Sequence, residues 1–438
     1  MLAGPSCVRR AAPPTARRAS RSAPLREYRT YLRVPTPSGV ARVPLRAGSV
    51  FGLATSRGNR EYQEDTWTAA CVLVPPSELR ASLRASWSRI VKQAAERWHP
   101  EPETEDDGQV VWFACYDGHG GRAVSAHLRD TLHATFESVD ARLATAIVQH
   151  TRSLGGYFRR FTGGALERWV RQEELKPVRA GQKRETPAED ASADLVAQDP
   201  PEGVTDMTLA ERCTLAWLLA DREVQITEAL QSGGSTASVC LLHSLDSPTQ
   251  PWYSSALLSV TTAQVGDTRL LLCARSDGRA IPLTNYHHPD DRGEADRLRK
   301  LGAGMVTDSF GEARWMGALA NTRSFGDSMY KKAGVTAEPE VITQVLKGED
   351  YSFIIAYSDG VGEKLSDQEI VDLCRGAPHP SDAAKAVLSF AEELGAEDNG
   401  TVLVIPLKGW GQTQGEDTTL AQREYRKSKT DVFREQRR

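Results

Sequence analysis

Acidic residues gather in four short motifs of this sequence, and their surroundings indicate a site for divalent cations. The motifs are Arg60-Glu-Tyr-Gln-Glu-Asp65, Asp117-Gly-His-Gly-Gly121, Ser358-Asp-Gly360 and Glu397-Asp-Asn399. Each of the last three adjoins an apolar run typical of a strand, so a rigid sheet would hold these side chains at strand ends. Carboxylates crowded there need a cation, because like charges at close range cannot all ionise. Oxygen-rich clusters suit Mg²⁺ or Mn²⁺, and two such ions about 3.5 to 4 Å apart can activate a water and clamp a phosphoryl group.

Each motif alone has a plainer explanation. An Asp-Gly pair is most often simply part of a turn, and an isolated Glu-Asp pair is usually a solvated surface. The combination of all four in one chain favours a metal site over four unrelated surface features.

Strands and helices that would position these motifs can be predicted from the apolar pattern. Strands are predicted at 49–56, 66–74, 110–117, 235–244, 255–266, 268–281, 340–346, 351–361 and 401–407. Helices are predicted at 122–139, 208–231, 293–303, 366–376 and 380–396. Because the strands lie in adjacent runs while the helices cluster elsewhere, the pattern favours an α+β layered domain over alternating βαβ units.

Three segments fall outside this pattern. Residues 172 to about 206 are polar and without periodicity, which predicts a disordered insertion, and the charged stretch from 411 predicts a flexible tail. Residues 1–50 contain ten arginines and a single acid, Glu27, a composition that matches a mitochondrial transit peptide. A disordered basic arm that binds nucleic acid or an anionic membrane is the alternative for that leader.

The composition excludes several classes of protein. The chain has 438 residues, of which 40% are apolar and 26% charged, and it contains no apolar run long enough to span a bilayer. Its seven cysteines form no Cys-x-x-Cys pair, which argues against a zinc knuckle or a disulfide scaffold and favours a reducing compartment. The net charge of -4, with an acidic body behind the basic leader, argues against nucleic-acid binding by the whole protein.

Taken together, the motifs resemble the metal-dependent PPM family of serine/threonine protein phosphatases, often called type 2C, over residues 48 to 410. The matching stretches are REYQED at 60–65, CYDGHGG at 115–121, GGSTASV at 233–239, AQVGDTR at 263–269, LANTRSFGD at 319–327, VTAEPEV at 335–341, AYSDGV at 356–361 and EDNGTV at 397–402. The resemblance implies a four-layer α-β-β-α sandwich with two central antiparallel β-sheets. It also implies hydrolysis of phosphoserine and phosphothreonine on proteins by a water that two Mg²⁺ or Mn²⁺ ions activate.

The same resemblance implies roles for individual residues. The implied metal ligands are Asp65, Asp117, Gly118 through its carbonyl, Asp359 and Asp398, with Asp267 for a weaker third ion. Arg60 is implied as the phosphate-binding side chain, since a guanidinium binds phosphate as a bidentate fork, and Glu64 is implied to orient the water. His119 is the expected general acid, because imidazole titrates near neutral pH; a metal ligand or a structural residue is the alternative. Asn399 is expected to position Asp398 or the water.

Two stretches depart from the family pattern. Where many members carry an aromatic residue and an aspartate after Ser-Asp-Gly, this chain has Gly362 and Glu363, which removes a packing group and weakens the case for a third metal. Where the family has Asp-His-Lys-Pro, Tyr286 and His288 replace the aspartate and the lysine. The pair His287-His288 is expected to be structural rather than a metal site.

The expected organisation is a basic leader at 1–47, one phosphatase domain at 48–410 with an insertion around 140–206, and a flexible tail at 411–438. Phosphorylated proteins are the expected partners, with no nucleic acid and no transmembrane segment. We expect a monomer in the mitochondrial matrix, with the cytoplasm as the alternative. Two other functions compete: a PPM-fold scaffold that binds phosphoproteins with weak or no turnover, and another two-metal hydrolase such as a nuclease. The intact set of site residues argues against the first, and the acidic body against the second.

Overall fold

Runs of apolar side chains place most of the described strands in two antiparallel sheets. The computed structural model describes residues 29–99, 105–176, 194–299, 305–307, 313–315 and 320–436. One sheet has the order β13 (Glu340–Lys347), β7 (Leu257–Val265), β6 (Gly234–Ser244), β5 (Gln109–His119) and β4 (Thr66–Leu73), and β12 (Phe325–Gly326) also pairs with β6. The other sheet has the order β3 (Gly52–Ser56), β15 (Gly400–Pro406), β14 (Tyr351–Tyr357), β8 (Arg269–Ala274) and β9 (Ala280–Pro282).

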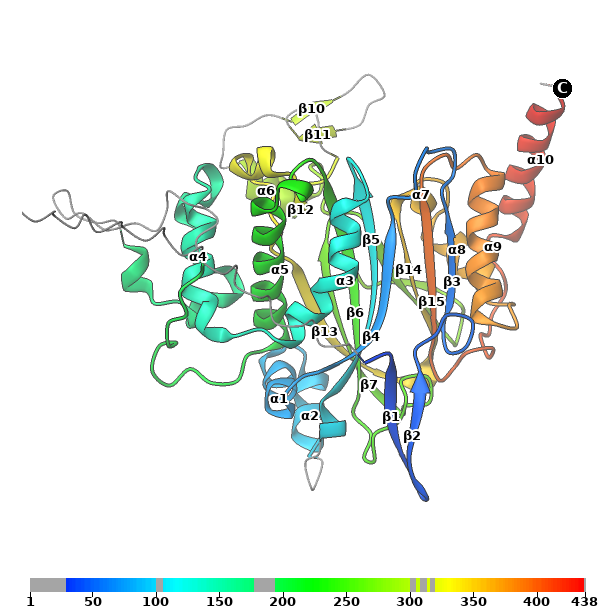
Figure 1. The fold of residues 1–438 in the computed structure, drawn as a ribbon. Coiled ribbons are helices and arrows are strands. Elements are labelled where there is room, and N and C mark those ends of the chain that lie inside the picture. Colours follow the sequence, from blue (N-terminus) through cyan, green and yellow to red (C-terminus); the bar gives the residue numbers. More distant parts are fainter. Residues whose placement is uncertain are drawn as a thin grey trace, which may run out of the picture.

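Strand β5 shows how one strand contributes to two apolar layers, because successive side chains point to opposite faces of a sheet. Val110, Trp112 and Ala114 pack in one cluster with helices α3 (Ala123–Glu137) and α5 (Leu209–Ile226). Val111, Phe113 and Cys115 pack in a second cluster with apolar side chains of the other sheet. Helices α8 (Asp367–Cys374) and α9 (Pro380–Glu393) cover the outer face of that other sheet. The order helix, sheet, sheet, helix confirms the predicted four-layer sandwich (Figure 1).

The remaining elements surround this sandwich. They are the helices α1 (Pro76–Ala85), α2 (Arg89–Arg97), α4 (Ala144–Ser153), α6 (Arg292–Arg299), α7 (Asp359–Gly362) and α10 (Leu420–Gln436), and the strand pairs β1 (Tyr31–Thr36) with β2 (Gly39–Pro44) and β10 (Met305–Thr307) with β11 (Ala313–Trp315). Short 3₁₀ helices include η3 (Gly156–Arg160), η4 (Gly164–Trp169), η5 (Gln172–Leu175) and η7 (Ser328–Ala333). Among the residues that the structure describes, no helix combines the length and the apolar character needed to cross a membrane.

The folded part begins earlier than the sequence predicts. In the β1–β2 hairpin, Leu32 and Val34 are buried in the cluster between the two sheets. The backbone N–H of Cys71 donates to the carbonyl of Arg29 at 2.8 Å, which ties the start of this segment to β4. The predicted leader boundary at residue 47 is therefore wrong for residues 29–47, because their apolar side chains complete a core. Residues 1–28, which hold the rest of the predicted leader, lie outside the described residues.

The insertion is more ordered than its polar composition suggests. Ile147 of α4 and Trp169 of η4 share an apolar cluster with Leu215 of α5. Residues 194–206 fold back onto this unit, where the carbonyl of Asp199 accepts a hydrogen bond from Nε of Arg171 at 2.8 Å. The predicted disorder is therefore wrong for residues 172–176 and 194–206, because arginines of the insertion bind this backbone. Residues 177–193 lie outside the described residues.

The C-terminal segment is a helix where the sequence predicts a flexible tail. Nη1 of Arg426, on α10, lies 2.7 and 2.8 Å from the two carboxylate oxygens of Glu369, which is only 1% exposed. A carboxylate buried in this way requires a cationic partner. The prediction for 411–438 is therefore wrong for residues 411–436, since α10 supplies that partner to α8.

Candidate functional site

A cavity of about 840 Å³ contains most of the residues predicted to do chemistry. Its lining includes Arg60, Glu64, Asp117, Gly118, His119, Asp267, Asp359, Asp398 and Asn399. β5 ends with His119, β14 ends just before the turn to Asp359, and β15 begins just after Asn399. β14 and β15 are antiparallel neighbours in one sheet, and β5 belongs to the sheet packed against it, so residues far apart in the sequence line one cavity. Among the predicted site residues, Asp65 does not line the cavity, and it is 3% exposed.

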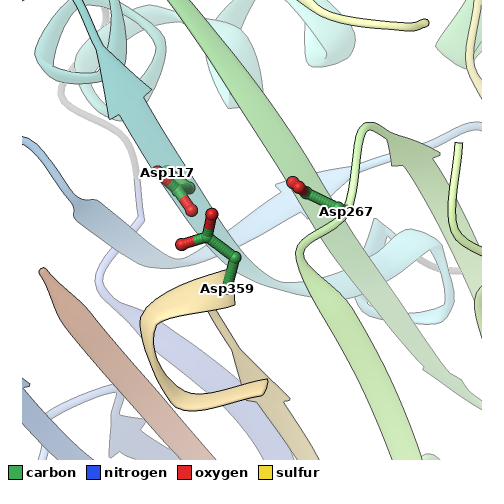
Figure 2. A group of neighbouring side chains, drawn as sticks. All are labelled: Asp117, Asp267 and Asp359. Atoms are coloured by element: carbon green, nitrogen blue, oxygen red, sulfur yellow. The ribbon is translucent and has the colours of Figure 1, made fainter. Parts of the chain in front are cut away.

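Three carboxylates converge in this cavity. Asp117, Asp267 and Asp359 each offer a carboxylate oxygen, and these oxygens all lie within 4.8 Å of one another. Figure 2 shows the carboxylates of Asp117 and Asp359 close together, with Asp267 approaching from a neighbouring loop. Oδ2 of Asp117 and Oδ1 of Asp267 are buried and have no hydrogen-bond partner among the described residues. Unpaired buried carboxylate oxygens are costly, and oxygen donors are what Mg²⁺ and Mn²⁺ prefer, so these residues fit a divalent cation.

The raised pKa values of these carboxylates also indicate a cation site. Burial, followed by the charge of Asp267, raises the pKa of Asp359 to about 8. Burial also raises the pKa of Asp65 to about 6, and it raises those of Asp117 and Asp267 above the ordinary value. A cation bound beside these carboxylates would lower their pKa values and favour their charged forms.

Asp65 and Asp398, two further predicted ligands, lie outside the group of three. Oδ2 of Asp65 accepts a hydrogen bond from the hydroxyl of Ser358 at 2.7 Å, while its Oδ1 is buried without a partner among the described residues. Oδ2 of Asp398 instead pairs with Nη2 of Arg60 at 2.5 Å. The Arg60 side chain is 62% exposed, so its guanidinium is anchored on one side and open on the other.

While its backbone N–H donates to Oδ1 of Asp398 at 2.7 Å, Asn399 holds a loop through its side chain. Its Oδ1 accepts a hydrogen bond from the backbone N–H of Glu64 at 2.7 Å. Its Nδ2 donates to the carbonyls of Arg57 and Tyr62, each at 2.9 Å. The side chain therefore fixes the backbone of residues 57–64, which carries both Arg60 and Glu64. This contact with the loop comes in addition to the predicted role of Asn399 in positioning Asp398 or the water.

His119 has a partner, Asp327, that is not among the predicted site residues. Nε2 of His119 lies 2.9 Å from Oδ2 and 3.0 Å from Oδ1 of Asp327. Burial lowers the pKa of His119, but the hydrogen bond and charge of Asp327 outweigh it, so the net shift is upward. Asp327 is the last residue of the LANTRSFGD stretch, and that position was the only signal in the sequence.

The residues that depart from the family pattern meet at the cavity wall. Tyr286, His288, Gly362 and Glu363 all line the cavity. His287 is buried, and its Nδ1 accepts a hydrogen bond from the backbone N–H of Gly266 at 3.1 Å. The structural assignment of the histidine pair is thus confirmed for His287, whereas His288 lies at the site.

Known proteins resemble this chain in sequence and in fold. The family model described as "Protein phosphatase 2C" matches residues 151–400. "Protein phosphatase 2C homolog 4" of Schizosaccharomyces pombe is 30% identical over 401 residues, which cover 90% of each chain. "Protein phosphatase 1K, mitochondrial" of Xenopus laevis is 32% identical over 198 residues, which cover 45% of this chain and 49% of that protein. A solved phosphatase structure from Toxoplasma gondii has a TM-score of 0.50 at 18% identity, over 82% of this chain and 92% of its own, and supports the fold alone.

Proposed function

The chain belongs to the protein phosphatase 2C family and is a metal-dependent protein serine/threonine phosphatase, and on this premise we propose that two Mg²⁺ or Mn²⁺ ions bind in the cavity. The proposed ligands are Asp65, Asp117, the carbonyl of Gly118, Asp359 and Asp398, with Asp267 for a weaker third ion. The observation that carries the proposal is the convergence of Asp117, Asp267 and Asp359, with buried oxygens that lack a partner among the described residues. When bound, such ions supply a nucleophilic water at neutral pH and neutralise charge on the phosphoryl oxygens.

The chain's own side chains bind and orient the substrate in this proposal. Arg60 binds the phosphate through the exposed side of its guanidinium, while Asp398 holds the other side at 2.5 Å. Glu64 orients the attacking water, on a loop whose backbone Asn399 fixes. His119 donates a proton to the departing serine or threonine oxygen, because an alkoxide is otherwise a poor leaving group. Positive charge beside the phosphoryl group, such as that of Arg60, stabilises the transition state, and electrostatic stabilisation is the largest contribution to many enzymatic rate enhancements.

The test is hydrolysis of a phosphothreonine peptide with and without Mn²⁺ or Mg²⁺, for the wild type, Asp359→Asn and Asp382→Asn. Asp359→Asn removes one ligand charge at constant volume and is expected to abolish metal-dependent turnover. Asp382, exposed on α9, is the matched control, and its variant is expected to retain wild-type turnover. Wild-type turnover in Asp359→Asn would contradict the metal assignment. No turnover by the wild type at any metal concentration would favour the scaffold that binds phosphoproteins.

We also propose that the protein acts in the mitochondrial matrix. The arginine-rich composition of residues 1–28 supports this location, and so does the name of the Xenopus laevis relative. A fusion of residues 1–50 to a fluorescent protein is expected to reach mitochondria, and a cytosolic fusion would favour the cytoplasm instead. The protein is proposed to act as a monomer on phosphorylated proteins, and light scattering of the purified chain would test its mass.

A further inference from the structure

We propose that Asp327 is a positioning residue that holds the imidazole of His119 for proton donation, and that Gly234 is required because any side chain there would separate the two. This inference deepens the proposed function, since it rests on His119 as the general acid. In the hydrolysis, the water oxygen forms a bond to phosphorus and releases a proton to solvent, while the bond between phosphorus and the serine or threonine oxygen breaks and leaves its electron pair on that oxygen. Asp327 occupies Nε2 of His119, so the proton that completes the leaving alcohol comes from Nδ1, and solvent then restores it.

Strand register creates the contact between the two side chains. His119 of β5 pairs with Gly234 of β6, and Gly234 pairs in turn with Gly326 of β12. Asp327 follows Gly326 directly, so its carboxylate reaches back across β6 toward the imidazole. At this end of the sheet β6 lies between the other two strands, because it pairs with β5 along one edge and with β12 along the other.

Gly234 leaves the space through which this contact passes. A Cβ on Gly234 would lie 2.4 Å from Nε2 of His119 and 2.6 Å from Oδ2 of Asp327. Both distances are far below van der Waals contact, so even a methyl group would push the imidazole and the carboxylate apart. Gly234, the second glycine of the GGSTASV stretch, therefore has a steric role at the site in addition to its part in the packing of β6.

The backbone of Asp327 is held in an unusual conformation. Its φ of 50° is in the left-handed region, which non-glycine residues seldom adopt, with Asn and Asp as the commonest exceptions. Two groups buried beneath it hold this turn. Oδ1 of Asp221 accepts hydrogen bonds from the N–H of Gly326 and from Nζ of Lys331, each at 2.9 Å. Lys331 also donates to the carbonyl of Ser324 at 2.9 Å, so residues on both sides of Asp327 are tied to one buried ion pair.

The experiment compares two substrates that differ in their leaving group. A phosphothreonine peptide releases an alkoxide that needs a proton, whereas p-nitrophenyl phosphate releases a phenolate that does not. Asp327→Asn keeps the backbone conformation and removes the charge, while His119→Gln removes the proposed acid. In both variants kcat for the peptide is expected to fall by about 10²-fold, with KM unchanged, while kcat for p-nitrophenyl phosphate falls by less than about threefold. A merely structural defect would lower kcat for both substrates by a similar factor.

A second variant breaks the contact without removing either side chain. Gly234→Ala is expected to show the same selective loss on the phosphothreonine peptide. Gly376→Ala is the matched control, because Gly376 is exposed and an added Cβ would have no heavy atom within 4 Å. Calorimetric titration with Mn²⁺ is expected to give the same affinity in all these variants, which would separate the pair from a disturbed metal site.

The outcomes are distinguishable. No turnover of either substrate by the wild type with Mn²⁺ would overturn the proposed function itself. Wild-type turnover of the peptide by Asp327→Asn, or an equal loss on both substrates, would overturn only the positioning role. Circular dichroism identifies a variant that fails to fold, in which case the other variant decides. If neither Asp327→Asn nor Gly234→Ala folds, the pair is structural and the proposal is wrong.

Discussion

The phenol oxygen of Tyr286 lies 3.7 Å from the point that a Cβ on Gly362 would occupy. Tyr286 stands where the family has an aspartate, and Gly362 where many members have an aromatic residue. Arg269 braces the tyrosine, with its guanidinium carbon 4.1 Å from the ring centroid. The aromatic group missing at 362 is therefore supplied from 286, and the cavity keeps an aromatic wall.

Restoring an aromatic residue at position 362 is expected to overpack this wall. A Cβ at position 362 would lie 3.0 Å from Cε2 of Tyr357, and the indole of a tryptophan there would need the space that Tyr286 occupies. Gly362→Trp should cost about 1 to 3 kcal/mol in the free energy of unfolding. Combining it with Tyr286→Ala should cost less than the sum of the two single changes, as measured by denaturant unfolding. Gly376→Trp, at an exposed glycine, serves as control, and strict additivity would refute the compensation.

Removal of metal is expected to make stability depend on pH in a definite direction. The pKa of Asp359 is about 8 in the fold and about 3.9 in an unfolded chain, so the unfolded state loses its proton first. The free energy of unfolding of the metal-free protein should therefore fall as pH rises from about 4 to 8. In chelator at pH 8, Asp359→Asn should be more stable than wild type by about 1 to 3 kcal/mol. With saturating Mn²⁺ the wild type should be more stable than Asp359→Asn. If Asp359→Asn were less stable than the wild type in chelator, repulsion among the buried carboxylates would not destabilise the metal-free protein.

Loss of the Asn399 side chain is expected to loosen the loop that carries Arg60 and Glu64. Asn399→Ala removes three hydrogen bonds to that loop, so kcat/KM for a phosphothreonine peptide should fall by about 10²-fold. Asn399→Asp keeps the acceptor for the N–H of Glu64 but loses both donors, and an intermediate loss is expected. Steady-state kinetics at saturating Mn²⁺ would measure both. Equal activity of the Ala variant and wild type would show that the loop holds its shape without this side chain.

Glu294 is expected to make the fold sensitive to acid. It is buried, and its carboxylate accepts hydrogen bonds from Arg297 and Arg323, each at 2.7 Å. Burial alone would raise its pKa, but the two guanidinium groups outweigh it and hold the pKa well below the ordinary 4.5. Its stabilisation is therefore present above about pH 4.5 and is lost as pH falls further.

Glu294→Gln should cost about 3 to 5 kcal/mol at pH 7, because two partly buried guanidinium groups lose their buried carboxylate. Its free energy of unfolding should also fall less steeply below pH 4.5 than that of the wild type. Unfolding curves between pH 3 and 7 would measure both effects. Glu228→Gln, at an exposed position, is the matched control. A variant with wild-type acid sensitivity would show that another carboxylate governs this range.

The sequence alone identified the family and many of the residues that line the cavity. Eight stretches in a fixed order are specific, and residues such as Asp117 and Asp359 stand beside strongly apolar strands, so their placement at strand ends was predictable. The amphipathic spacing of 122–139 likewise predicted α3, because a helix at the edge of a core repeats its apolar residues every three or four positions.

Only the tertiary structure decided which of these residues touch. His119 and Asp327 are separated by 208 positions, and their contact depends on the register of β5, β6 and β12, which apolar alternation does not specify in strands buried on both faces. Asn399 reaches the loop at 57–64 for the same reason, since β3 and β15 are neighbours in the sheet. No local sequence pattern predicted that residues 420–436 form a helix packed on the domain, because the charged residues of α10 are stabilised by partners such as Glu369 on another helix. Local patterns determine the elements, and long-range pairing determines the contacts, because each contact requires both partners to be in place.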